Sequence, residues 1–335
     1  MKVYVKCPSK VTLFGEHAIV YGYPAISASL GKYLHMTIEE WREGIVIMAE
    51  GVKVDGAAVH IRKDWEIRSL GYADYPKHAL RYIITALKLI EAEYAKLKPA
   101  KIMVKSTLPV GAGLGTSASV SVATIAGYLK YLGYEPTRKE IVKLAHKTEY
   151  TVQGKASPMD TSTVTYGGIL YIKPKGEYGE AYIENLPKIK PKVVIGYVEK
   201  KYNTGFLVAR VRELLDKNPK IIGAIMENIG RIVEKAKQLI KEERWEDLGR
   251  LMDVNHGLLY ALGVSTLELE RMVYASRLAG AYGAKLTGAG GGGSIVALVP
   301  EEKAENVKRA IEISGGKAFI AEIGVRGVEV EKVKS

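Results

Sequence analysis

The sequence is poor in cysteine and begins without an apolar run. Cys7 is the only cysteine among 335 residues, which excludes an internal disulfide framework. The first ten residues, MKVYVKCPSK, lack the apolar stretch of a signal peptide. These features together predict a cytoplasmic protein.

Long hydrophobic segments are also missing. Residues 109–129 contain no charged side chain, but their glycines, serines and threonines make the stretch far too polar to span a bilayer. We therefore expect no membrane association and interpret this stretch as a buried element of a site.

No basic block interleaved with aromatic residues occurs, although the chain is basic overall. The 49 Lys and Arg against 37 Asp and Glu give a formal net charge of +12. In RIVEKAKQLIKEERWEDLGRLM, acids and bases alternate at helical neighbour spacing, which is typical of a solvated helix face. The pattern predicts no nucleic-acid partner, while a basic surface would help to attract a polyanionic nucleotide.

The length and the order of elements predict two α+β domains. A chain of 335 residues with 47% hydrophobic composition can bury a large core. Strand-like and helix-like segments are mixed without strict βαβ alternation, which favours layers over a partly antiparallel sheet. Residues 173–192 concentrate proline, glycine and charge, so we predict domains at 1–185 and 186–335.

The stretch PVGAGLGTSASV, residues 109–120, has three glycines before the predicted helix 117–132. Dense glycines weaken regular structure but let backbone N–H groups approach a ligand such as phosphate. Neither GxGxxG nor GxxxxGK[ST] matches, because Thr116 stands where each needs glycine. A phosphate loop and a tight structural turn both remain open at this point.

Two further stretches have compositions typical of functional sites, one rich in glycine and one in charged and imidazole side chains. KLTGAGGGGS, residues 285–294, has five glycines between 288 and 293, and KVTLFGEHAIVYG, residues 10–22, places Lys, Glu and His after an apolar strand. Taken alone, the glycines are explained by tight turns, and His17 by a structural role. Thr137 and Glu140 form a capping-box pattern that places Glu149 near the end of the next helix.

Three motifs, SKVTLFGEHAIVYG, LPVGAGLGTSASV and KLTGAGGGGS, resemble those of the GHMP kinase superfamily, in this order. GEHAIVYG is similar to the mevalonate kinases, whereas galactokinases read more like GEHTDYN. The segments EYTVQGKASPMD, NTGFLVARVR and DVNHGLLYALGVS resemble the same family, so the likeness spans nearly the whole chain. It implies a two-domain fold with the active site in the interdomain cleft, and ATP-dependent phosphorylation of the 5-hydroxyl of mevalonate in isoprenoid biosynthesis.

The resemblance also implies an ATP phosphate loop at a helix N-terminus, followed by a magnesium site. The loop residues are Pro109, Val110, Gly111, Ala112, Gly113, Leu114, Gly115, Thr116 and Ser117. Thr116 replaces a serine common in relatives but keeps a hydroxyl. Ser117 and Glu149 match the Mg²⁺ ligands, and a hard cation of this kind accepts such oxygens together with phosphate and water.

For catalysis, the resemblance implies Asp160 and Lys10. Asp160 follows Glu149 by 11 residues, the separation found in the family. It would accept or orient the proton of the substrate hydroxyl, and Lys10 would keep its carboxylate ionised. A plain helix cap is the alternative for this aspartate.

The implied substrate residues are Glu16, His17 and Thr204. His17 would hydrogen-bond mevalonate or, if protonated, pair with its carboxylate. Asn255 and His256 lie in a matching segment without an assigned role. The third motif would shape the floor of the site, through Lys285, Thr287, Gly288, Gly290 and Gly291.

Two rival interpretations remain at this point: another small-alcohol kinase of the superfamily, and a silent member that serves as a binding module. Retention of Lys10, Ser117, Glu149 and Asp160 together favours an active enzyme. ATP and mevalonate are the expected small-molecule partners, and a homodimer is left open. Residues 50–108 carry no motif for an adenine pocket.

Overall fold

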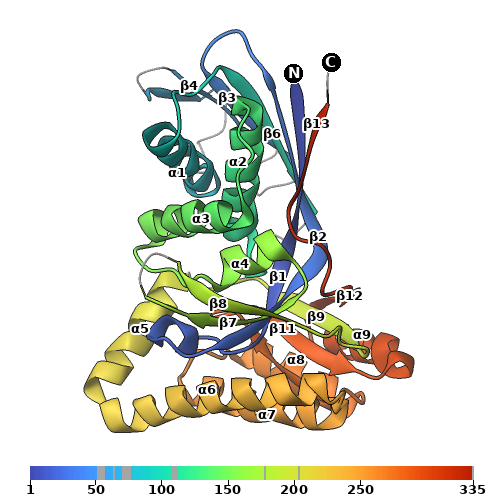
Figure 1. The fold of residues 1–335 in the computed structure, drawn as a ribbon. Helices are drawn as coiled ribbons and strands as arrows, with labels where there is room; N and C mark the ends of the chain where they lie inside the picture. Colours follow the sequence, from blue (N-terminus) through green and yellow to red (C-terminus); the bar gives the residue numbers. More distant parts are fainter. Residues whose placement is uncertain are drawn as a thin grey trace.

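The computed structural model describes residues 1–50, 57–62, 65–69, 77–107, 112–176, 179–202 and 204–333. Two layered parts are stacked on one another, a larger sheet with its helices above and a smaller sheet with its helices below (Figure 1). In the described part of the chain, no helix is long and apolar enough to cross a membrane. The prediction of an α+β fold is confirmed.

The larger sheet has nine strands in the order β13-β1-β2-β6-β3-β4-β5, with β7 on β2 and β8 on β7. Long β2 pairs with β6 through residues 34–40 and with β7 through residues 25–28. All pairs are antiparallel except β3 with β6. The strands are β1 (Lys2–Phe14), β2 (Ala25–Glu40), β3 (Ile45–Glu50), β4 (Ala57–Ile61), β5 (Ile67–Ser69), β6 (Ala100–Ser106), β7 (Ile169–Pro174), β8 (Ala181–Leu186) and β13 (Glu329–Val333).

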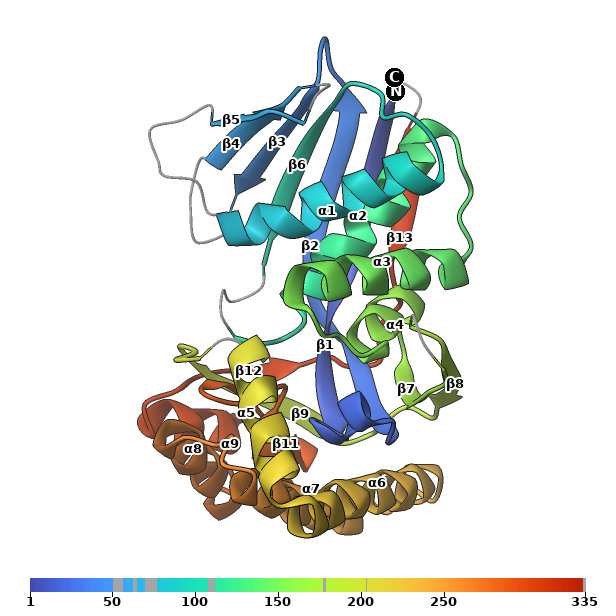
Figure 2. The ribbon, with the colours of Figure 1, turned by 90° about the vertical axis from the view of Figure 1, so that its left-hand side faces the viewer.

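Helices α1 to α3 lie across one face of this sheet (Figure 2), and α4 follows below them (Figure 1). Ile90 of α1 and Leu129 of α2 are buried with Leu34 and Ile38 of β2 in one apolar cluster. Burial of this apolar surface stabilises the upper part. These helices are α1 (Lys77–Glu93), α2 (Thr116–Leu132), α3 (Arg138–Gln153) and α4 (Met159–Tyr166).

The smaller sheet is antiparallel, in the order β10-β11-β9-β12. Its strands are β9 (Lys192–Val198), β10 (Gly283–Thr287), β11 (Gly293–Val299) and β12 (Lys317–Ala321). The remaining helices, of which α6 and α7 form the outer layer at the bottom of Figure 1, pack on it. They are α5 (Thr204–Lys217), α6 (Pro219–Lys241), α7 (Trp245–Ala261), α8 (Leu267–Leu278) and α9 (Ala304–Ile313), with the short 3₁₀ turns η1 (Ala18–Tyr21) and η2 (Glu301–Lys303).

The β1–β2 hairpin links the two parts, because its strands are long enough to reach both. Phe14 and Ile26 share an apolar cluster with Ile195 of β9 and Leu239 of α6. This hairpin therefore carries its polar residues to the junction between the parts.

The C-terminal strand returns to the first sheet. β13 pairs with β1 from Lys2↔Val333 to Lys6↔Glu329, so both termini lie together at the top of Figure 1. The predicted boundary at 185/186 falls at the end of β8, and the segment predicted as a connection contains that strand. The two sheets therefore do not divide the chain into two continuous halves.

Local helix signals were predicted well. α2 begins one residue before the predicted Ser117 and ends at Gly133, whose left-handed backbone closes it. The Thr137–Glu140 capping box is present at the start of α3. Strands β3 and β4 pair in antiparallel fashion, and residues 51–56 between them lie outside the described residues.

Candidate active site

Four elements meet around a cavity of about 140 Å³ at the junction of the two parts. Ser117, in the first turn of α2, donates a hydrogen bond to Glu149 Oε1 at 2.8 Å. Lys10 Nζ on β1 lies 2.9 Å from Asp160 Oδ1 in the first turn of α4. Eight of the predicted site residues line this cavity, namely Lys10, Glu16, His17, Ser117, Glu149, Asp160, Thr204 and Gly288.

The described part of the predicted phosphate loop contacts strand β1 before it enters α2. Pro109, Val110 and Gly111 lie outside the described residues. Lys10 N donates to Leu114 O at 3.0 Å. Gly115, with φ +83°, is the N-cap of α2, and a Cβ there would lie 2.6 Å from Lys10 Cγ. Glycine at this position therefore leaves room for the Lys10 side chain beside Asp160.

The end of α3 supplies a buried carboxylate. Burial, and then the negative charge of Asp160, raise the pKa of Glu149 to about 8, although the Ser117 hydrogen bond and Lys10 oppose the shift. The carboxylates of Glu149 and Asp160 influence one another, so a cation would be attracted to this pair. Among the described residues, no cluster of three or more His, Cys, Asp or Glu side chains surrounds a point here. A cation would thus take two protein oxygens, with phosphate and water completing its shell, which fits Mg²⁺.

The third motif is tied to β1 by Thr287 and Lys285. Thr287 Oγ1 accepts a hydrogen bond from Thr12 N at 3.0 Å and donates one to Thr12 O at 2.9 Å. Gly288 lines the cavity, whereas Gly290 packs so closely that a Cβ would lie 2.1 Å from Val264 O. Gly291 donates its N–H to that same carbonyl at 2.8 Å and does not line the cavity. The motif therefore joins the lower part to the strand that carries Lys10.

Glu16 and Lys285 form an ion pair that is buried on both sides. Lys285 Nζ also donates to Leu286 O at 2.7 Å. Burial raises the pKa of Glu16, although Lys285 opposes the shift. Glu16 Oε2 is buried and, within the described ranges, has no hydrogen-bond partner. Within this ion pair, Oε2 is the oxygen that can accept a hydrogen bond from a ligand.

His17 is held neutral. Burial lowers its pKa to about 4, despite the hydrogen bond to Ala289 O at 3.1 Å. Because a carbonyl only accepts, Nε2 carries the proton and donates it. With no ligand bound, the ring is therefore neutral at neutral pH and can hydrogen-bond a ligand, and the alternative of a protonated His17 paired with a substrate carboxylate stays a prediction.

Sequence reasoning missed Lys200. Its Nζ donates to Thr204 Oγ1 at 2.9 Å. Burial, and then the charge of Lys10, lower the pKa of Lys200 to about 8. A Cβ on Gly113 would lie 4.0 Å from its Nζ, so this ammonium faces the phosphate loop. The only sequence signal for Lys200 was its position four residues before Thr204. The run Lys-Lys-Tyr that it begins looks like solvent-exposed surface.

Asn255 and His256 do not line the cavity. His256 Nδ1 accepts a hydrogen bond from Leu286 N at 3.2 Å, and its Nε2 lies 3.0 Å from Glu270 Oε1. His256 therefore supports strand β10, the strand that carries Lys285.

Comparisons with known proteins agree with this geometry. The model for the N-terminal domain of GHMP kinases matches residues 81–168, and the model for their C-terminal domain matches residues 236–317. The fold and both matches define the class as a GHMP kinase. A mevalonate kinase of Pyrococcus furiosus is 44% identical over 342 residues, covering 99% of each chain. That of Thermococcus sibiricus is 42% identical over 341 residues, again covering 99% of each chain. The chain belongs to the mevalonate kinase family.

Solved structures show the same fold. The Methanococcus jannaschii mevalonate kinase has a TM-score of 0.77 at 31% identity, covering 96% of this chain and 98% of that one. A Lactococcus lactis galactokinase has a TM-score of 0.79 at 20% identity, covering 98% of this chain and 95% of that one, which shows the fold alone.

Proposed function

We propose that this chain transfers the γ-phosphoryl group of ATP to the 5-hydroxyl of mevalonate, giving 5-phosphomevalonate for isoprenoid biosynthesis. The observation that carries the proposal is the junction of two polar pairs in one cavity. Lys10 with Asp160, and Ser117 with Glu149, lie where the start of α2 meets strand β1, the end of α3 and the start of α4. Phosphoryl transfer depends mainly on positioning and charge neutralisation, and this arrangement supplies both.

The start of α2 holds the ATP phosphates. The first N–H groups of a helix have no partner within it, and the helix dipole adds a positive potential. The proposed loop runs from Pro109 to Ser117. Lys200, facing Gly113 from the other side, adds a cation toward the same phosphates. Its side chain is half-buried, so the ammonium is partly desolvated, which strengthens its interaction with an anion.

Asp160 receives or orients the proton of the mevalonate 5-hydroxyl. Its carboxylate is 26% exposed and faces the cavity, while Lys10 is only 4% exposed and fixes its position. Because the transition state for phosphoryl transfer is loose, orientation of the hydroxyl matters at least as much as its deprotonation. Lys10 offsets the charge that develops on the transferred group.

Ser117 Oγ and Glu149 would hold Mg²⁺, with the ATP phosphates supplying further oxygens. The ion would neutralise part of the phosphate charge. For the acceptor, we assign Glu16 Oε2 to a substrate hydroxyl, because this buried oxygen has no partner in the described part of the chain. Neutral His17 and Thr204 complete the acceptor site. A homodimer and a cytoplasmic location stay predictions, the first testable by light scattering on the purified protein.

The test is ATP consumption with a panel of alcohols: mevalonate, phosphomevalonate, homoserine and galactose. Mevalonate should be turned over far faster than the others. Asp160→Asn should lower kcat by about 10²-fold or more while ATP binding survives. The double variant with Lys10→Met should lose less than the sum of the two single losses, because the residues act as a pair. Asp216→Asn, on exposed α5, is the matched control.

The metal assignment has its own test. Ser117→Ala and Glu149→Gln should each raise the Mg²⁺ concentration that gives half-maximal rate, since each removes one oxygen ligand. Glu246→Gln in the first turn of α7 is the control. Unchanged Mg²⁺ dependence in both variants would exclude these two residues as metal ligands and leave the phosphotransfer proposal standing.

A further inference from the structure

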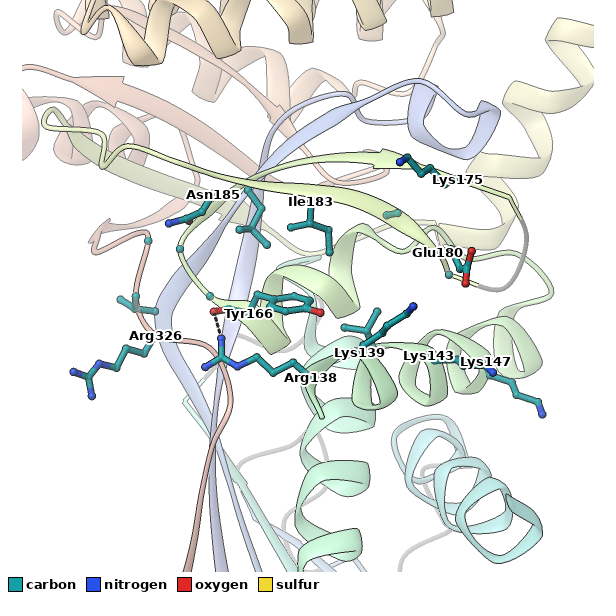
Figure 3. A pocket seen from close by; sticks show the side chains of 18 of the residues that line it. Arg138, Lys139, Lys143, Lys147, Tyr166, Lys175, Glu180, Ile183, Asn185 and Arg326 are labelled. Carbon is teal, nitrogen blue, oxygen red and sulfur yellow. Dashed lines mark hydrogen bonds between the residues drawn. The ribbon is translucent and has the colours of Figure 1, made fainter. Parts of the chain in front are cut away.

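A second cleft, of about 1440 Å³, lies between helix α3 and the β7–β8 hairpin (Figure 3). Residues 324–326 close one end of it. None of the residues that line it lines the catalytic cavity, so it is a separate feature of the surface. The proposed phosphotransfer gives it no role.

The cleft is basic. Its lining includes two acidic side chains, Glu93 and Glu180, and six basic ones, Arg138, Lys139, Lys143, Lys147, Lys175 and Arg326. Lys147 pairs with Glu93 at 2.5 Å, and Arg138 donates to Tyr166 O at 2.9 Å. Within the ranges that the structure describes, Lys139 and Lys143 have no carboxylate within 4.0 Å. This surplus of positive charge suits an anionic partner.

The basic side chains on α3 form a regular row. Lys139, Lys143 and Lys147 are exposed and follow one another at four-residue intervals along the helix. With a rise of about 1.5 Å per residue, the row spans roughly 12 Å in steps of about 6 Å. A ligand that uses the whole row must be extended.

The opposite wall, the β7–β8 hairpin, adds apolar side chains beside Lys175, Glu180 and Asn185. Ile183 of β8 points into the cleft in Figure 3, and Leu170 of β7 lines it as well. Val142 of α3 lies at the foot of the lysine row. A ligand that fills the cleft therefore needs apolar groups as well as charge.

Three of the four glycines in the described lining have no N–H group free for a phosphate. The N–H of Gly167 is donated to Thr163 O at 2.9 Å, that of Gly168 to Val325 O at 2.9 Å, and that of Gly324 to Ser29 O at 2.8 Å. A main-chain anion site needs such groups to be free. The volume also exceeds the range of about 300–1,000 Å³ usual for a small ligand.

We propose that this cleft binds an extended acidic segment of a partner protein, with carboxylates at alternate residues facing α3 and apolar side chains facing the hairpin. Alternate side chains of an extended chain share one face at about 6.6 Å, close to the spacing of the lysine row. Tyr166 is the only aromatic side chain in the described lining, so the cleft offers few surfaces on which bases could stack, which disfavours a nucleic acid.

The test is fluorescence anisotropy on the full chain with a labelled peptide, Glu-Val-Glu-Val-Glu-Val-Glu. We expect saturable binding that weakens with added salt. Lys139→Glu with Lys143→Glu should weaken it by about tenfold or more, and the matching Lys→Arg pair should retain it. The control Lys220→Glu with Lys317→Glu makes the same charge change outside both cavities and should bind within about twofold of the original chain. Unchanged mevalonate-dependent ATP turnover shows that each variant is folded.

Ile183→Ser should weaken binding as well, because the apolar side chains of the hairpin are proposed to contact those of the partner segment. A peptide of the same composition with its glutamates and valines in separate blocks should bind more weakly. The proposal is overturned by absence of saturation with the alternating peptide, by equal binding of the block peptide, or by displacement with tripolyphosphate or oligouridylate at equal charge concentration.

Discussion

Replacing Lys285 with methionine should expose how far the catalytic cavity depends on the ion pair beneath it. Lys285 and Glu16 have side-chain exposures of 0% and 1%, and they lie on β10 and directly after β1. Removal of the lysine leaves the Glu16 carboxylate buried without its counter-charge. Breaking a buried pair in this way costs about 3–5 kcal/mol, because the remaining charge keeps its desolvation penalty.

The double variant Lys285→Met with Glu16→Gln should be more stable than Lys285→Met alone, because it leaves no buried charge. Lys308→Met is the matched control. Its partner Glu305 lies 3.4 Å away, and the two side chains are 32% and 61% exposed. Such exposed pairs contribute under about 1 kcal/mol.

The assay is guanidinium chloride unfolding at pH 7, followed by both tryptophan fluorescence and far-UV circular dichroism. Coincident transitions justify a two-state free energy. The cost of Lys285→Met should shrink at pH 5. Burial raises the pKa of Glu16, and in the Lys285→Met variant no lysine at position 285 opposes this shift. The carboxyl therefore binds a proton in the folded state, and the folded state gains stability as the pH falls. A cost below about 1 kcal/mol, or a double variant less stable than the single one, would refute the reasoning.

Four further predictions concern the cavity. Gly115→Ala should lower kcat by about tenfold or more, because its Cβ would lie 2.6 Å from Lys10 Cγ. The control Gly133→Ala, at the other end of α2, also has a left-handed backbone (φ +99°) but nothing within 4 Å of its Cβ, and it should stay much closer to the original rate in the same assay. The pKa of His17 falls from 6.5 to about 4 on burial, so its contribution to stability is complete above pH 6.5 and is lost as the pH falls toward 4. His17→Gln should therefore flatten the pH dependence of the unfolding free energy over that range. His17→Ala should raise the KM for mevalonate but leave that for ATP nearly unchanged, and the reverse pattern would move it to the nucleotide side. Lys200→Met should raise the KM for ATP, Lys200→Arg should restore it, and equal loss in both would point to a structural role.

The features predicted correctly from sequence are those with local causes. A capping box at Thr137–Glu140 and a glycine at 133 act within one helical turn, so α2 and α3 could be placed closely. The motifs likewise identified candidate residues, because each is continuous in the chain.

Features that depend on distant contacts escaped prediction. The Glu16–Lys285 pair joins residues 269 positions apart, and β13 closes on β1 across almost the whole chain. Lys200 stands in a run that looks like solvated surface. Nothing local distinguishes these residues, since their role arises from which elements pack against them.

The sequence by itself determined the chemical groups that are available: hydroxyl, carboxylate, ammonium and imidazole at the ends of recognisable elements. Only the tertiary structure decided their charge states and partners. Burial beside Asp160 raises the pKa of Glu149 to about 8, and burial lowers that of His17 to about 4. The cost of removing a charge from water, and its attraction to a neighbouring charge, depend on depth and distance, and these exist only after the chain has packed.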